Sequence, residues 1–202
     1  MGELPKPIIE LRKLISKMPG FSERGAERFL EWWWEHNEEN GYFYKNWADF
    51  IKFKPCRKCF LFASEETCDF CLDEERDSSR ICVVSSAFTA YLVEKEASFN
   101  GLYFVLGGEI VGSRNYKLLE SIKKRLYLLK NRVINEKIPE VIIATDFTSR
   151  GETTALFIKD YLKGTPVKIS RLAQGFHPGD SLGYGDPVTL KKAFENRQNY
   201  GS

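Results

Sequence analysis

The sequence predicts a multidomain α+β protein, and three observations along its 202 residues support this fold class. Apolar residues at helical spacing occupy residues 1–54, two C-x-x-C pairs follow within residues 55–77, and strand-like apolar runs alternate with helical patterns over residues 78–175. Such alternation favours a mainly parallel sheet that helices cover on both faces. We therefore expect a helical domain, a cysteine knuckle, an α/β domain and a C-terminal segment over residues 176–202.

The N-terminal part is predicted to contain two helices joined by a tight turn. The first is indicated by five apolar residues at helical spacing, Ile8, Leu11, Leu14, Ile15 and Met18. Pro19-Gly20 ends it, and Ser22 is the expected N-cap of the second helix. The second helix carries its own apolar stripe of Ala26, Phe29, Leu30 and Trp33.

The turn between these helices, Pro19-Gly20-Phe21-Ser22, resembles that of helix-hairpin-helix modules. In such a module the free backbone N–H groups at the start of the second helix bind a phosphate without reading sequence. Ser22 stands where the module usually has a second glycine, and a purely structural helical hairpin is the alternative.

Aromatic residues are dense at the end of this part. Trp32-Trp33-Trp34 is followed by Tyr42, Phe43, Tyr44, Trp47, Phe50 and Phe53. Three consecutive tryptophans point in different directions around a helix, so they do not share one face. We interpret the cluster as the core of a small domain together with a self-association surface, with base stacking on the rings as the alternative.

The two cysteine pairs, Cys56-x-x-Cys59 and Cys68-x-x-Cys71, are the most specific motif in the chain. Each pair brings two sulfurs to one side of a tight turn, and two such turns close a Cys₄ tetrahedron, which suits Zn²⁺. Because no coordination position is left for water, a structural zinc site is expected; two disulfides or a redox C-x-x-C are the alternatives. Cys82 lies in an apolar run, where a buried, inert thiol is expected.

Composition and charge say less about function than the cysteine pairs do. The N-terminus lacks the pattern of a signal peptide, and no apolar run approaches the length of a membrane span, so we expect no membrane association. Thiols used for a metal fit a reducing compartment, which favours a cytoplasmic protein. The net charge is only +2, but basic residues outnumber acidic ones between Arg114 and Lys137. That stretch is either a phosphate-binding stripe or a solvated helix face.

The α/β part is predicted to contain strands at residues 81–84, 102–106, 140–144 and 167–170, and helices at residues 88–96, 116–130 and 153–162. In parallel sheets the working residues lie beyond the carboxyl ends of the strands. Those ends carry Ser85-Ser86, Gly107-Gly108 and Thr145-Asp146.

The loop from Thr145 to Glu152, Thr-Asp-Phe-Thr-Ser-Arg-Gly-Glu, resembles the Toprim fold of topoisomerases, primases and related nucleases. Active Toprim domains hold Mg²⁺ against phosphates with an Asp-x-Asp pair and a glutamate at the end of the first strand. This sequence keeps Asp146, but Thr148 replaces the second aspartate and Ser85 or Ser86 replaces the glutamate. The resemblance implies a Toprim framework without its metal chemistry; for Asp146 alone, capping of the loop is the alternative.

The order of helical hairpin, Cys₄ knuckle and degenerate Toprim domain resembles RecR, a family of bacterial recombination mediators, over nearly the whole chain. The strongest motifs are the cysteine pairs and Ser170-Arg171-Leu172-Ala173-Gln174-Gly175; Leu106-Gly107-Gly108 and the stretch from Tyr184 to Leu190 add to them. The resemblance implies a non-enzymatic DNA-repair protein that forms a dimer or tetramer ring. It also implies that RecO, RecF or both cooperate with it to load RecA onto single-stranded DNA coated by its binding protein.

The same resemblance implies roles for particular segments. The Toprim face, with Asp146 and Glu152, would contact protein partners, and residues 176–202, a Walker-B-like stretch, would contribute to assembly. Single- or double-stranded DNA would be bound without sequence choice by basic side chains that neutralise phosphates. Our candidates for these contacts are Arg24, Arg28, Lys52, Lys54, Arg57 and Lys58.

Two other functions compete with this one. A Toprim-type, Mg²⁺-dependent nuclease or primase would need the carboxylates that Ser85 and Thr148 replace. A structural zinc protein that binds only other proteins would show no salt-sensitive affinity for DNA.

Overall fold

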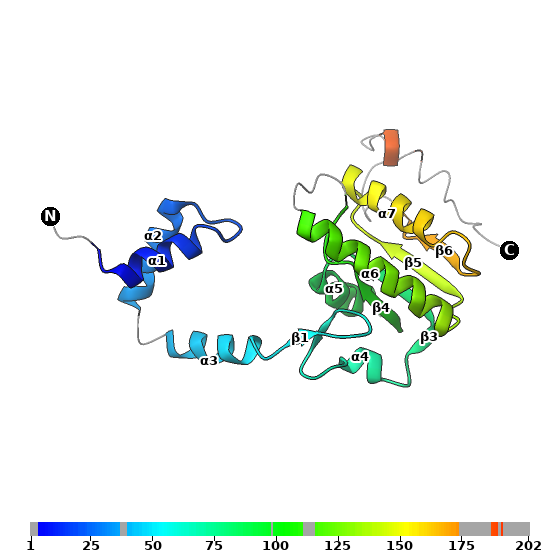
Figure 1. Cartoon of the computed structure of the whole chain (residues 1–202), viewed down its shortest axis with the longest axis horizontal. Coiled ribbons are helices and arrows are strands. Elements are labelled where there is room, and N and C mark those ends of the chain that lie inside the picture. Colours follow the sequence, from blue (N-terminus) through cyan, green and yellow to red (C-terminus); the bar gives the residue numbers. More distant parts are fainter. Residues whose placement is uncertain are drawn as a thin grey trace. The chain divides into compact units, whose positions relative to one another are not determined.

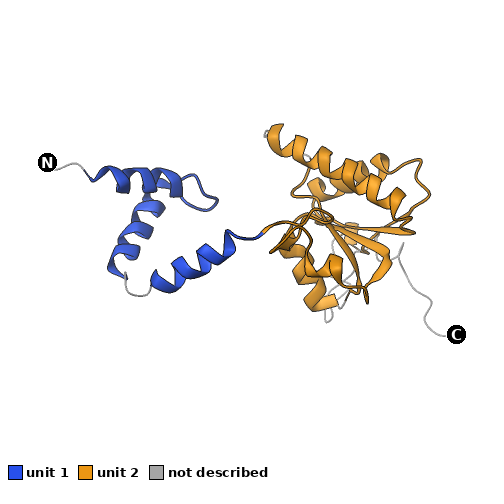
Figure 2. Ribbon diagram, turned by 60° about the horizontal axis from the view of Figure 1, so that its bottom comes forward, with its two compact units in different colours: residues 1–53 blue, residues 54–202 orange. Residues whose placement is uncertain are grey.

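The computed structural model describes residues 4–36, 40–97, 99–110, 116–173, 187–189 and 191. The chain divides between Phe53 and Lys54 into two compact units, residues 1–53 and 54–202 (Figure 2). Arg114, the glycine that ends the Ser170–Gly175 motif and nearly all of the predicted C-terminal segment lie outside the described residues.

The first unit contains three helices, α1 (Lys6–Ile15), α2 (Glu23–Glu35) and α3 (Asn40–Phe50). The predicted cap of α2 is confirmed, because the Ser22 Oγ accepts a hydrogen bond from the Gly25 N–H at 3.1 Å. The turn before it uses Gly20 at a φ of +85°, a conformation that favours glycine. Helix α1 ends at Ile15, short of the predicted stripe residue Met18.

The three tryptophans of α2 divide between the interior and the surface of this unit. Trp33 is half-buried, and its ring packs edge-on against Phe43 of α3 with centroids 4.8 Å apart. Its indole Nε1 also donates to the Tyr44 hydroxyl at 3.2 Å. Trp34, in contrast, is 81% exposed. Trp33 therefore joins α2 to α3, while Trp34 is available at the surface.

The second unit is built on the predicted parallel sheet (Figure 1). Its strands are β3 (Asp77–Val84), β4 (Gly101–Val105), β5 (Glu140–Ala144) and β6 (Lys168–Arg171), in the order β4-β3-β5-β6 and parallel throughout. The helices are α5 (Ala87–Ala97), α6 (Tyr116–Asn135) and α7 (Ser149–Tyr161). The predicted α+β class with a mainly parallel sheet is thus confirmed.

The two faces of this sheet carry separate cores, as the alternation of side chains along each strand requires. On one face, residues such as Ile81, Phe104 and Ile143 pack with α6 and α7. On the other, Cys82, Tyr103 and their neighbours pack with α5 and with the cysteine knuckle. Because all strands run in one direction, their carboxyl ends meet at a single edge, here called the carboxyl edge.

The knuckle, residues 54–72, precedes the sheet. It consists of an antiparallel pair, β1 (Lys54–Pro55) and β2 (Phe62–Ala63), and the short helix α4 (Asp69–Leu72). Among the described residues, no helix has the length and apolar character needed to cross a membrane.

Candidate metal centre and carboxyl edge

The four knuckle cysteines converge. The sulfur atoms of Cys56, Cys59, Cys68 and Cys71 all lie within 4.8 Å of one another, and three of these residues are buried. The Sγ atoms of Cys59 and Cys68 are 3.3 Å apart. Four thiolates around Zn²⁺ with bonds of about 2.3 Å place neighbouring sulfurs about 3.8 Å apart. The donor set, its spacing and its burial therefore fit zinc.

Local backbone geometry explains this convergence. In the first turn, the Phe60 N–H donates to the Cys56 carbonyl at 2.9 Å, and Phe60 itself has a φ of +65°. In the second, the Cys71 N–H donates to the Cys68 carbonyl at 2.9 Å as α4 begins. The backbone N–H groups of Lys58 and Cys68 both point at the Cys56 sulfur at 3.4 Å, an arrangement that stabilises a thiolate.

The electrostatics of the four thiols favour a bound cation. The pKa of Cys68 is lowered because Cys59 and Cys71 form hydrogen bonds with its sulfur. The pKa of Cys59 is raised by its hydrogen bonds with Cys68 and Cys71 and by burial. One thiolate therefore forms readily while further negative charge is opposed, so a bound cation is needed to ionise the whole set. All five cysteines are free thiols, including the buried Cys82.

At the carboxyl edge, two hydroxyl groups cap helices. The Ser86 Oγ accepts from the Thr89 N–H at 3.1 Å at the start of α5. The Thr148 Oγ1 accepts from the Gly151 N–H at 3.1 Å at the start of α7. Among the described residues, the cysteines are the only group of three or more His, Cys, Asp or Glu side chains that could hold a metal ion. No acidic metal cluster is found at the described carboxyl edge.

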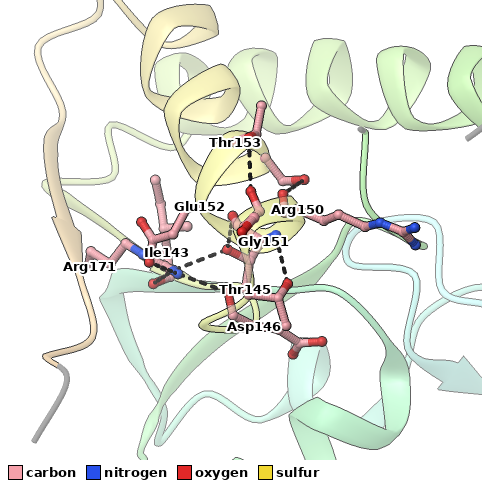
Figure 3. A network of polar contacts seen from close by, with 11 residues as sticks. Ile143, Thr145, Asp146, Arg150, Gly151, Glu152, Thr153 and Arg171 are labelled. Atoms are coloured by element: carbon pink, nitrogen blue, oxygen red, sulfur yellow. Dashed lines mark hydrogen bonds and ion pairs between the residues drawn. The ribbon is translucent and has the colours of Figure 1, made fainter. Parts of the chain in front are cut away.

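Arg171 holds the Asp146 loop in place, although the sequence analysis named this residue only as part of the Ser170–Gly175 motif. Arg171, on β6, donates from Nη1 to the Thr145 Oγ1 at 3.0 Å and to the Ile143 carbonyl at 3.3 Å. From Nη2 it donates to the Asp146 carbonyl at 3.1 Å and to the Glu152 carboxylate at 3.0 Å (Figure 3). The Asp146 side chain is exposed, whereas Glu152 forms part of the loop's own framework.

Gly151 lets the loop close on itself. A Cβ atom at this position would lie 1.9 Å from the Asp146 carbonyl oxygen. The Thr145 Oγ1 also donates to the Gly151 carbonyl at 2.9 Å, which ties the strand end to the first turn of α7. The backbone of the loop and that of the helix therefore approach too closely for any side chain.

The predicted DNA contacts are all exposed but belong to different units. Arg24 and Arg28 lie one turn apart on α2, and Lys52, in the same unit, pairs with Asp49 at 2.7 Å. Lys54, Arg57 and Lys58 belong to the knuckle, where Arg57 pairs with Glu66 at 2.7 Å.

The basic stretch of α6 does not form one phosphate-binding face. Lys123 and Lys124 are exposed, but Arg132 is buried and donates to the Tyr103 carbonyl at 3.3 Å. Arg125 turns inward to the Val105 carbonyl at 3.0 Å. These two arginines stabilise the fold by hydrogen bonds to β4 and do not form part of an exposed basic face. Counting charges along the sequence does not reveal this role.

The parallel sheet and its Gly-Glu helix start define a Toprim domain, and the family model of the Toprim domain matches residues 79–173. Relatives that match almost the full length of the chain show which Toprim-containing family it belongs to. The chain is 34% identical to recombination protein RecR of Thermus thermophilus, over 96% of this chain and 97% of the relative. It is 36% identical to recombination protein RecR of Protochlamydia amoebophila, over 97% and 98% of the two chains, and 36% identical to that of Rickettsia bellii, over 99% and 100%. The chain belongs to the RecR family of recombination proteins.

Proposed function

We propose that this chain is a recombination mediator in DNA repair that binds DNA as an oligomer and performs no phosphoryl chemistry. The family supports the process. One structural observation supports a non-enzymatic role: Ser86 and Thr148 cap helices at the carboxyl edge, where catalysis would need carboxylates for Mg²⁺.

The finer mechanism has four parts. Zinc bound by the four cysteines stabilises the knuckle. Exposed basic side chains hold the DNA backbone without sequence choice. The exposed Asp146 and its loop contact RecO, RecF or both, and the complex loads RecA onto single-stranded DNA coated by its binding protein. The chain acts in the cytoplasm as a dimer or tetramer ring.

DNA binding is tested by charge reversal on α2. Arg24→Glu with Arg28→Glu removes two cations from one helical face, because residues four apart lie on the same side. Affinity for labelled single- and double-stranded DNA should fall about tenfold or more. The slope of log affinity against log salt concentration should become shallower by about two, one for each lost phosphate contact. Fluorescence anisotropy at two salt concentrations measures both quantities.

Lys45→Glu with Lys13→Glu is the matched control, since these exposed lysines undergo the same charge change on α3 and α1. Equal weakening in both double variants would point to net charge rather than to α2. Unchanged binding by a folded α2 variant rejects the hairpin as a contact.

The enzymatic alternative is tested directly. Supercoiled DNA incubated with Mg²⁺ and the purified chain should remain uncut, as it should with Asp146→Ala. Cleavage that requires Mg²⁺ and disappears in Asp146→Ala would establish a nuclease instead.

A further inference from the structure

Strand β4 is the outermost strand on one side of the sheet, and side chains cover its outer edge. The carbonyl groups of alternate residues point to the same edge of a strand. On β4 those of Gly101, Tyr103 and Val105 each accept a hydrogen bond from a different arginine. The donors are Arg76 Nε at 3.0 Å, Arg132 Nη1 at 3.3 Å and Arg125 Nη1 at 3.0 Å, respectively.

Each of these arginines also contacts the knuckle. The guanidinium of Arg76 lies 4.5 Å from the centre of the Phe70 ring, and that of Arg125 lies 4.3 Å from the centre of the Phe60 ring. Arg132 donates from Nη1 to the Lys58 carbonyl at 3.3 Å. Phe60 and Lys58 flank the metal ligand Cys59, and Phe70 precedes the metal ligand Cys71.

The knuckle also reaches β4 directly, because the Cys59 carbonyl accepts from the Val105 N–H at 2.8 Å. The turns that hold the sulfurs are thus the same turns that face the arginines and the strand. Disorder in these turns would remove the knuckle contact of each of the three guanidinium groups.

Charge adds to this geometry. Arg76 forms a bidentate pair with Glu94, at 2.9 and 2.6 Å, and Arg132 pairs with Glu136 at 3.0 Å. Arg125 has no carboxylate partner among the described residues, and burial lowers its pKa. Zn²⁺ with four thiolates carries a net negative charge, which is the counter-charge that a layer of partly buried arginines needs.

We infer that Arg76, Arg125 and Arg132 form a coupling layer through which metal bound at the knuckle orders strand β4 and the turn that follows it. Arg125 extends this effect to the carboxyl edge. A Cβ on Gly107, whose φ is +86°, would lie 2.6 Å from Arg125 Nη1. The Gly107 N–H in turn donates to the Ser85 carbonyl at 3.0 Å. This inference rests on the proposed zinc site.

Hydrogen–deuterium exchange on the full chain tests the inference, with zinc-loaded protein compared with protein treated with a chelator. Peptides that cover residues 101–107 should exchange about tenfold faster after metal removal, since their arginine and knuckle partners are lost. Peptides that cover residues 140–144 report on β5, which lies between β3 and β6, and should change much less.

Arg125→Gln provides the second arm, with Lys124→Gln, its exposed neighbour on α6, as the matched control. The Arg125 variant should keep its zinc yet show faster exchange at residues 101–107 while loaded, whereas the control should match the unmodified chain. The comparison of loaded and stripped wild-type chain needs no variant and stands even if Arg125→Gln misfolds.

The outcomes separate the inference from the metal assignment. A chain that binds no zinc contradicts both. A zinc-loaded chain whose residues 101–107 are unaffected by chelation contradicts only the coupling. Equal acceleration at residues 101–107 and 140–144 also contradicts it, because the metal would then stabilise the whole fold rather than β4.

Discussion

Arg171 and Glu152 form an ion pair at the carboxyl edge, with Nη2 and Oε1 3.0 Å apart. The pair joins β6 to the first turn of α7, and the same guanidinium lies 5.1 Å from the centre of the Phe147 ring. One side chain thus holds the strand end, the loop and the helix start together.

Truncation of this arginine should loosen the Asp146 loop. We expect Arg171→Ala to lower the free energy of unfolding by about 2–4 kcal/mol, since it removes the donor to the Asp146 carbonyl and the cation beside the Glu152 carboxylate. Urea denaturation measures the loss. Lys168→Ala, at an exposed position on the same strand, is the control and should have little effect. A loss equal to that of Lys168→Ala would show that the network contributes little.

The close approach at Gly151 predicts a strong steric effect. Gly151→Ala places a methyl group on the Asp146 carbonyl, so a loss of about 3 kcal/mol or more is expected as the loop is displaced. Gly41→Ala, in helix α3 with nothing within 4 Å of the new Cβ, should be neutral or stabilising by up to about 1 kcal/mol. Thermal unfolding of both variants provides the comparison, and a harmless Gly151→Ala would contradict this close approach of loop and helix.

Zinc should depend on the knuckle sulfurs and not on the fifth cysteine. Cys68→Ser should lose the metal and unfold at a lower temperature, while Cys82→Ser should retain about one zinc per chain. Elemental analysis and calorimetry measure the two quantities. Because binding requires thiolates, zinc affinity should fall as the pH falls and protons compete for the sulfurs. Zinc retained by Cys68→Ser, or affinity independent of pH, would argue against a thiolate site.

Burial raises the pKa of Cys82 to about 12, from an ordinary value of 9.0. In the folded chain this thiol stays protonated, whereas in the unfolded chain it ionises above its ordinary pKa. Its contribution to stability is therefore complete below pH 9.0 and declines as the pH rises toward 12. Alkylation with iodoacetamide, followed by mass spectrometry, should label Cys82 only after denaturation. After chelation alone, the knuckle cysteines should react before Cys82, because Cys71 is half-buried and the pKa of Cys68 is lowered by its hydrogen bonds with Cys59 and Cys71. Early labelling of Cys82 would contradict its burial.

Self-association is expected to involve the aromatic surface of the first unit. A groove of about 620 Å³ lies between α1 and α2 and is lined by Leu11, Leu30 and Trp34 among others. Trp34→Glu places a charge at its rim and should reduce the oligomeric state measured by light scattering. Leu156→Glu, at an exposed apolar position on α7 of the second unit, is the control. An unchanged mass for Trp34→Glu would remove this surface from the interface.

Periodicity in the sequence predicted the elements with strong apolar patterns, such as β5, whose bounds agree with the prediction. It missed the first residues of β3, Asp77 to Arg80, because they are polar and pair with other strands only through their backbone. It also missed α3, because this segment contains a glycine, two asparagines and several aromatic residues and has no clear helical pattern. Its packing partner Trp33 belongs to another helix, α2.

The candidate sites also divide into those that local sequence patterns predict and those that depend on contacts between distant residues. The cysteine spacing was sufficient to predict the cluster because each C-x-x-C turn is local. The hydrogen bonds of Arg171 to the Asp146 loop and of Arg132 to β4 connect residues about 25 or more positions apart in the sequence. A single sequence holds no signal for such contacts.

The cap that Thr148 provides has a consequence for which residues this position tolerates. Aspartate and threonine are both good N-caps, and each presents an oxygen to the same backbone N–H. The Gly151 N–H that Thr148 now satisfies would be satisfied equally by a carboxylate at that position. Threonine and aspartate at this position therefore cap α7 alike, so the architecture of the helix start does not depend on which of the two residues stands there.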